Sequence, residues 1–486
     1  MTPTMAPVER MGTGDLMTLA ADLGTPPMQI AGILVLEGGS ALDVTAARAA
    51  IAERVRGIHR FRQRLVHPPP GLGRPYWTDA PDFAVGNHFR HVACPVPGDD
   101  DALLAVATEA VTQRLDRERP LWSVTFVTGL AGGAAALVFV VHHVLTDGIG
   151  GLGVLARIAD GMPVPDEPGF PRPVPGFRQL LTDSARDRLV GLRHLGAVPG
   201  RIRAALHELR LRDTASAPPS SLNRRTGPRR RFAVARADAT AVRTTARAHG
   251  GMVNDAVLAA ATGALHGLLS HRGETVSSLV VSMPVSTRGR DAGAHLGNHA
   301  FSVPIELPAA GHTLDRLATI AWLTHNRVGT ARGASAALVS PLFRVLARLK
   351  LLQWFVDHQT VLSTSITYLR GPATRLSFLG TPIREVIPLS TVKGNMTVSF
   401  VALSYAARLT VTAVTDPDQV TDLPVLMAAL ERELATLAVP AVPAAGQDGP
   451  KSPRAGTNGT GPGLPRRPTV EPEGDRARRQ GSQEGA

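Results

Sequence analysis

The 486-residue sequence is long enough for two or more domains, and its 44% hydrophobic and 19% charged residues are typical of a folded globular protein. It has no apolar run near the roughly 18–20 residues of a membrane span and no recognisable secretory signal, so we expect a cytoplasmic protein. The formal net charge of +12 predicts an anionic partner, such as a membrane surface or a phosphorylated ligand. With 4% aromatic residues and no nucleic-acid motif, nucleic acid is not expected as a partner. The single cysteine, Cys94, excludes an internal disulfide.

Residues 11–160 alternate between strand and helix patterns. Strand patterns occur at 28–38, 121–130 and 134–141. The last of these is continuously apolar, as a strand buried on both faces is. Helices are predicted over 45–55 and from about residue 152. We expect this part of the chain to form one α/β lobe.

Three more parts follow. Residues 161–231 are rich in proline and arginine and are predicted to be a helical connector, whose arginines form either a solvated helix face or a cationic surface for anionic groups. Residues 232–439 repeat the alternation of helices and strands, which predicts a second, similar lobe. Residues 440–486 contain few large apolar side chains and are predicted to be a disordered tail.

The most informative stretch is VFVVHHVLTDGIGG, over residues 138–151. A buried strand delivers His142 and His143 to the point where backbone pairing stops, and ligand and catalytic groups often lie at such strand ends. Histidine titrates near neutrality and can take and return a proton at working pH. Asp147 follows four residues after His143 and could orient the loop, while the glycines of 148–153 allow the backbone to turn tightly near a ligand.

Other interpretations of this stretch stay open on the residues alone. His142, His143 and Asp147 could bind a metal, although adjacent histidines do not easily share one ion and the sequence has no HExxH motif. The glycines of 148–153 match the spacing of a dinucleotide fingerprint, but the first of them does not lie at the strand end. The two histidines could also be core or surface residues without chemistry.

The wider pattern resembles a known family. VHHVLTDGIGG contains the HHxxxDG motif of the chloramphenicol acetyltransferase-like acyltransferase superfamily. PLW at 120–122, ND at 254–255 and GN at 297–298 occur in the order and spacing of the bacterial wax ester synthase/diacylglycerol acyltransferase family. The resemblance covers about residues 15–437. It implies an α/β (α+β) fold of two chloramphenicol acetyltransferase-like lobes with mixed sheets, joined by a crossover linker, with the active-site channel between the lobes.

The resemblance also implies roles for individual residues. His143 would be the general base that deprotonates an alcohol hydroxyl, and Asn298 would donate to the oxyanion of the tetrahedral intermediate. His142, Asp147 and Gly148 would support the site structurally. Arg288, which follows the PVS sequence, is the candidate partner of Asp147.

Three further positions match the family's motifs. Asn254 and Asp255 form the ND pair, and Asp255 either contributes to the site or caps the helix that starts there. Trp122 is expected to pack the lobe rather than to touch substrate. No metal site is expected.

The implied reaction transfers a fatty acyl group from acyl-CoA to a long-chain alcohol or diacylglycerol, with no resident cofactor. Acyl-CoA and the lipid acceptor would be the partners, with peripheral contact to an anionic membrane or lipid droplet surface. Two departures, Gln29 for the family's histidine and Tyr368 for its asparagine, keep other functions open. These are transfer to a polyketide alcohol or an amine, or a catalytically silent lipid-binding role.

Overall fold

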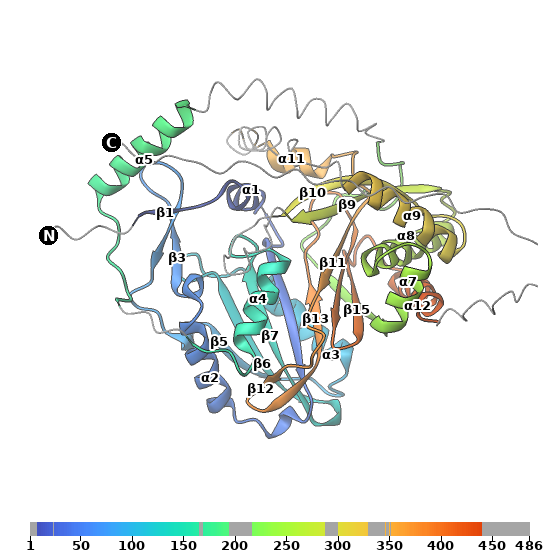
Figure 1. Ribbon diagram of the computed structural model, residues 1–486, viewed down its shortest axis with the longest axis horizontal. Helices are drawn as coiled ribbons and strands as arrows, with labels where there is room; N and C mark the ends of the chain where they lie inside the picture. The colour runs from blue at the N-terminus through green and yellow to red at the C-terminus, as the bar shows by residue number, and fades with distance from the viewer. Residues whose placement is uncertain are drawn as a thin grey trace, which may run out of the picture. The chain divides into compact units, whose positions relative to one another are not determined.

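The computed structural model describes residues 7–22, 24–164, 169–193, 216–286, 300–328, 346, 349 and 351–439. Two six-stranded sheets dominate this part of the chain (Figure 1). None of its helices is, taken singly, long and apolar enough to cross a membrane, and only the bent pair Ala239–Ala248 and Val253–His271 meets the length and composition criteria jointly.

The first sheet has the strand order β12-β13-β2-β7-β6-β5. Its strands are β12 (Ser377–Phe378), β13 (Thr381–Leu389), β2 (Gln29–Leu36), β7 (Ala134–His142), β6 (Trp122–Leu130) and β5 (Phe89–Ala93). β5 and β6 are parallel, and the other pairs are antiparallel. Every residue of β7 is buried, because apolar layers cover both faces of this central strand.

The second sheet has the strand order β10-β9-β11-β14-β15-β8. Its strands are β10 (Ala300–Pro308), β9 (Ser278–Ser286), β11 (Thr364–Arg370), β14 (Val398–Tyr405), β15 (Arg408–Thr415) and β8 (Arg231–Asp238). β11 runs parallel to β9 and β14, whereas the remaining pairs are antiparallel. Both large sheets are therefore mixed, as the sequence predicts.

Helices cover the sheets in two groups. α7 (Ala239–Ala248), α8 (Val253–His271), α9 (Thr313–Val328) and α12 (Leu423–Ala438) gather beside the second sheet in Figure 1 and pack on one another. α8 is the central member, and most of its side chains are buried. α2 (Val44–Arg56) and α4 (Gly148–Ile158) pack together on one face of the first sheet, and α3 (Asp100–Thr112) packs on the other.

The remaining elements are shorter or peripheral. They are α1 (Thr13–Ala21), α5 (Phe177–Arg193), α11 (Leu352–Asp357), the small sheet of β1 (Glu9–Arg10), β4 (Tyr76–Asp79) and β3 (Gln63–Val66), and the 3₁₀ turns Gly39–Ala41, His59–Arg62, Val85–Asn87 and Ala131–Gly133. Several helices start where the sequence provides an acceptor. The carboxylates of Asp43, Asp99 and Asp238 accept backbone N–H bonds at the first turns of α2, α3 and α7.

A segment from the later part of the sequence joins the first sheet, and its strand β13 is called the exchanged strand below. β12 and β13 come from the part of the sequence predicted to form the second lobe, yet β13 pairs with β2 over Ile383–Leu389 in the first sheet. The chain then returns to the second sheet through β14. Glu385 of β13 is buried and accepts from Arg236 of β8 and Thr410 of β15, so one carboxylate of the exchanged strand binds two strands of the other sheet.

Candidate active site

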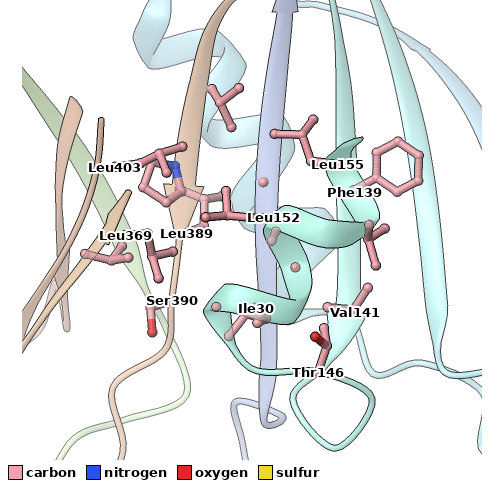
Figure 2. A pocket seen from close by; sticks show the side chains of 18 of the residues that line it. Ile30, Phe139, Val141, Thr146, Leu152, Leu155, Leu369, Leu389, Ser390 and Leu403 are labelled. Atoms are coloured by element: carbon pink, nitrogen blue, oxygen red, sulfur yellow. The ribbon is translucent and has the colours of Figure 1, made fainter. Parts of the chain in front are cut away.

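A cavity of about 190 Å³ lies between the first sheet, α4 and the second sheet. Figure 2 shows Leu152 and Leu155 of α4 on one side and Leu369 and Leu403 of the second sheet on the other. Ile30 and Phe139 belong to the first sheet. The wall is mostly aliphatic, so the cavity suits a hydrocarbon rather than a sugar or a nucleotide.

His143 lies on the wall of this cavity, one residue beyond the end of β7. Its backbone N–H donates to the carbonyl oxygen of Met28 at 2.8 Å, which continues the pairing of β7 with β2. The side chain is half-buried, and its Nδ1 atom has no hydrogen-bond partner among the described residues. Burial lowers the pKa of His143 from its ordinary value of 6.5, and the nearby Asp147 carboxylate offsets only part of this effect. The imidazole is therefore neutral at pH 7, in the form that can accept a proton.

Asp147 is the N-cap of α4. Its Oδ1 atom accepts from the backbone N–H of Gly150 at 2.9 Å, and the residue is buried. The predicted tight turn over 148–153 is wrong, because these residues form the first turns of α4. Gly148 allows a close approach instead: a Cβ there would meet Leu369 Cδ2 at 2.7 Å, so a larger residue would displace the Leu369 side chain.

The adjacent His142 does not line the cavity. Its Nδ1 accepts from the backbone N–H of Val144 at 3.1 Å, so this nitrogen is unprotonated and Nε2 carries the hydrogen. Nε2 donates to Oδ2 of Asp22 at 3.2 Å. Sequence reasoning missed Asp22, because it lies 120 residues before His142 in the chain and belongs to no motif.

Asp22 has a fully buried side chain and several cationic neighbours. Arg114 and Arg117 donate to its Oδ2 at 2.8 and 2.5 Å, and Lys393 Nζ lies 3.7 Å from Oδ1. Burial alone would raise the pKa of Asp22. The hydrogen bonds from His142 and Met28 N–H, with the positive charge of Arg114, outweigh this effect and hold the pKa far below its usual range. The carboxylate is therefore ionised near neutral pH.

Three other predicted positions lie outside the cavity wall. Trp122 is buried against Phe61 and His88, and its indole N–H donates to the carbonyl oxygen of Phe61. Asp255 accepts from the backbone N–H of Met252 and from Thr324 at the start of α8. Asn254 has its side-chain nitrogen 3.8 Å from the sulfur of Met283.

Arg288 and Asn298 fall outside the described residues, so their predicted roles as the partner of Asp147 and the oxyanion donor stay predictions. The predicted disordered tail, 440–486, also lies outside them. Within the described ranges, no group of three or more His, Cys, Asp and Glu side chains is placed to hold a metal ion.

Both departures from the family pattern have structural explanations. The Gln29 amide is buried and donates to the carbonyl oxygens of Val111 and Gln113, and its oxygen accepts from Leu115 N–H. Gln29 therefore fixes the segment after α3 and does not line the cavity. The Tyr368 hydroxyl bonds Ser404 Oγ at 2.8 Å, and Tyr368 itself does not line the cavity.

Comparison with known proteins agrees with the motif pattern. The model of the wax ester synthase/diacylglycerol acyltransferase catalytic domain matches residues 11–257, and that of the C-terminal domain of the same family matches residues 297–438. The chain belongs to the wax ester synthase/diacylglycerol acyltransferase family. It is 30% identical over 427 residues to a probable diacylglycerol O-acyltransferase of Mycobacterium tuberculosis strain H37Rv, covering 84% of this chain and 90% of that protein.

Solved structures show the same fold. The wax ester synthase/diacylglycerol acyltransferase from Marinobacter aquaeolei VT8 superposes with a TM-score of 0.64 at 22% identity, over 88% of this chain and 98% of that one. The first condensation domain of the CDA synthetase superposes with a TM-score of 0.61 at 19% identity, over 90% and 97%. The predicted two-sheet fold of the chloramphenicol acetyltransferase-like superfamily is thus confirmed.

Proposed function

We propose that this member of the acyltransferase family transfers a fatty acyl group from acyl-CoA to the hydroxyl of a long-chain alcohol or of diacylglycerol, with His143 as the general base. The observation that carries the proposal is a neutral imidazole on the wall of an apolar cavity between the two sheets. The aliphatic wall suits the hydrocarbon chains of both substrates. The imidazole is the group there that can take a proton from an alcohol near neutral pH.

The reaction needs one base and no covalent enzyme intermediate. As His143 removes the hydroxyl proton, the alcohol oxygen bonds to the thioester carbonyl carbon and the carbonyl becomes an oxyanion. When the intermediate collapses, the carbon–sulfur bond breaks and the proton passes from His143 to the sulfur. The products are an ester and free CoA, so His143 returns to its neutral form.

The other polar groups on the cavity wall either have structural roles or cannot act as a base. Asp147 caps α4, and its neighbour Thr146 donates to the carbonyl oxygen of Asp147 at 3.1 Å. Thr367 and Ser390 have no charge and cannot act as a base near pH 7. These assignments leave His143 as the wall residue with the required chemistry among the described residues.

The test is release of the CoA thiol from palmitoyl-CoA in the presence of hexadecanol, diacylglycerol or no acceptor. We expect acceptor-dependent turnover in the wild type, and a loss of roughly 10²–10⁴-fold in His143→Ala. Trp122→Phe is the control for a nearby buried substitution, because this ring packs away from the cavity.

Each contrary result has a defined meaning. Unchanged turnover in His143→Ala would refute the general-base role. Turnover with an amine or a polyketide alcohol, but with neither lipid acceptor, would reassign the acceptor. Binding of palmitoyl-CoA without turnover on any acceptor would favour the silent lipid-binding role.

A further inference from the structure

His143 is held on both sides by contacts that lead to Asp22. On one side, Asp22 Oδ1 accepts from Met28 N–H at 2.8 Å, and the carbonyl oxygen of Met28 accepts from His143 N–H at 2.8 Å. On the other side, Asp22 Oδ2 accepts from His142 Nε2, and His142 Nδ1 accepts from Val144 N–H. One buried carboxylate thus fixes the residues that precede and follow His143.

The same carboxylate joins segments that are distant in sequence. Arg114 also donates to the carbonyl oxygen of Gly24, and Lys393 donates to that of Ala21. Lys393 lies three residues beyond Ser390, which lines the cavity. Asp22 and the residues bonded to it therefore connect the end of α1, the segment before β6, the end of β7 and the segment after β13.

We propose that Asp22 is a positioning residue for acyl transfer, which keeps the His143 imidazole aimed at the cavity through Met28 on one side and through His142 and Val144 on the other. The inference rests on the proposed function of His143. Asp22 does not line the cavity, so it acts through the geometry of the loop. Displacement of a reacting group by about 1 Å can lower a rate roughly 100-fold.

Asp22→Asn tests the carboxylate directly. The amide NH₂ accepts no hydrogen bond, so Asp22→Asn loses either the bonds from His142 and the arginines or the bond from Met28 N–H, while side-chain volume is retained. We expect kcat to fall by roughly 10- to 100-fold and KM for palmitoyl-CoA and for the alcohol to stay within about twofold, because the cavity wall is unchanged. Asp422→Asn is the matched control, since Asp422 is a carboxylate paired with Arg272 away from the cavity. Its kcat should equal that of the wild type.

Two variants of His142 test separately its bond to Asp22 and its bond to Val144 N–H. His142→Asn places an oxygen where Nδ1 accepted from Val144, but it is too short to reach Asp22. His142→Gln can donate to Asp22 but loses the acceptor for Val144. Both should lower kcat. Because Asp22→Asn and His142→Asn break the same contact, the double variant should fall no further than the poorer single variant.

Several outcomes would overturn the inference: a kcat for Asp22→Asn equal to that of Asp422→Asn, a change confined to KM, or effects that multiply in the double variant. If Asp22→Asn does not fold, the two His142 variants decide, and normal kcat in both counts against the inference. Unchanged turnover in His143→Ala would instead remove the proposed function.

A readout independent of turnover is the nitrogen-15 spectrum of labelled histidine, with His143 assigned from its absence in His143→Gln. The His143 signals should move in Asp22→Asn and stay in place in Asp422→Asn. Signals that are identical in wild type and Asp22→Asn would contradict the positioning role even for a protein without measurable activity.

Discussion

The end of β7 separates two regions of opposite character. On one side, Asp22 and its cationic partners surround His142, and both ring nitrogens of this histidine are bonded. On the other side, His143 borders a mostly aliphatic cavity, and its Nδ1 has no partner in the part of the chain that the structure describes. Two identical, adjacent residues thus acquire different chemistry from their surroundings. In the mechanism that we propose, the polar side fixes the loop, and the apolar side lowers the pKa of the imidazole that acts as the base.

The largest effect is expected from removing the His143 imidazole from the apolar side. We expect His143→Gln to lower kcat by roughly 10²–10⁴-fold. Because burial lowers the pKa of His143 from 6.5, wild-type kcat/KM should decline with an inflection below pH 6.5 as the imidazole is protonated. The variant should lack this decline. An inflection above pH 6.5, or the same decline in His143→Gln, would contradict the assignment; stopped assays from pH 5 to 8 provide the measurement.

A smaller effect is expected from filling the cavity without touching the histidine. A Cβ on Gly151 would meet no atom within 4 Å, and Gly151 lines the cavity. Gly151→Leu should therefore lower kcat/KM for palmitoyl-CoA relative to butyryl-CoA by roughly tenfold, since pocket fit is worth about 1–3 kcal/mol for one methylene. Gly86→Leu is the control, because Gly86 is equally open but lies outside the cavity wall. A ratio that does not change would place the hydrocarbon elsewhere.

The contact that closes the cavity gives a stability prediction. In Gly148→Ala the new methyl would overlap Leu369, so we expect a loss of about 1–3 kcal/mol in the free energy of unfolding, measured with urea. Leu369→Ala removes the overlap, so the alanine at 148 should cost less in that background. Gly151→Ala should be close to neutral. Equal costs of Gly148→Ala in both backgrounds would argue against the contact.

The smallest expected effect probes the polar side through Lys393. Burial lowers its pKa from 10.5 to about 8, although Asp22 opposes the shift. Between these values the unfolded chain binds a proton that the folded protein lacks, so stability should rise with pH. Relative to Lys393→Met, the wild type should gain about 1 kcal/mol between pH 8 and 9. Cys94 and Tyr405 also have shifted pKa values near this range, but both proteins share them, so their contributions cancel in the difference. A flat difference would disprove the shift.

The sequence predicts the apolar side, with His143 at the cavity, far better than the polar side around Asp22. The apolar run before His142 identifies β7, and the HHxxxDG pattern identifies the family and the histidine at the cavity. Nothing local indicates Asp22, because its partners come from segments distant in sequence. The departure at Gln29 looked like a change at the site, and only its backbone contacts show that it stabilises the segment after α3.

The same limit applies to the fold. Period and composition identify the strands of both sheets, but they do not say which sheet a strand joins, and β13 joins the first sheet although its sequence neighbours join the second. Glycine also makes helix starts hard to predict from sequence. The helix α4 begins at Gly148, four residues before its first leucine. The Asp147 cap and the approach to Leu369 compensate for the poor helix propensity of glycine.

The exchanged strand bears on how this protein can be divided. Expressing residues up to 376 would leave β2 without its neighbour and turn a central strand into an open, largely aliphatic edge, a template for aggregation. A separate peptide of residues 377–389 would restore β12 and β13, and β13 could again pair with the open edge of β2. We therefore expect that residues up to 376 do not fold as an independent unit, and any exchange of segments between relatives must carry β13 together with β2, whose edge it completes.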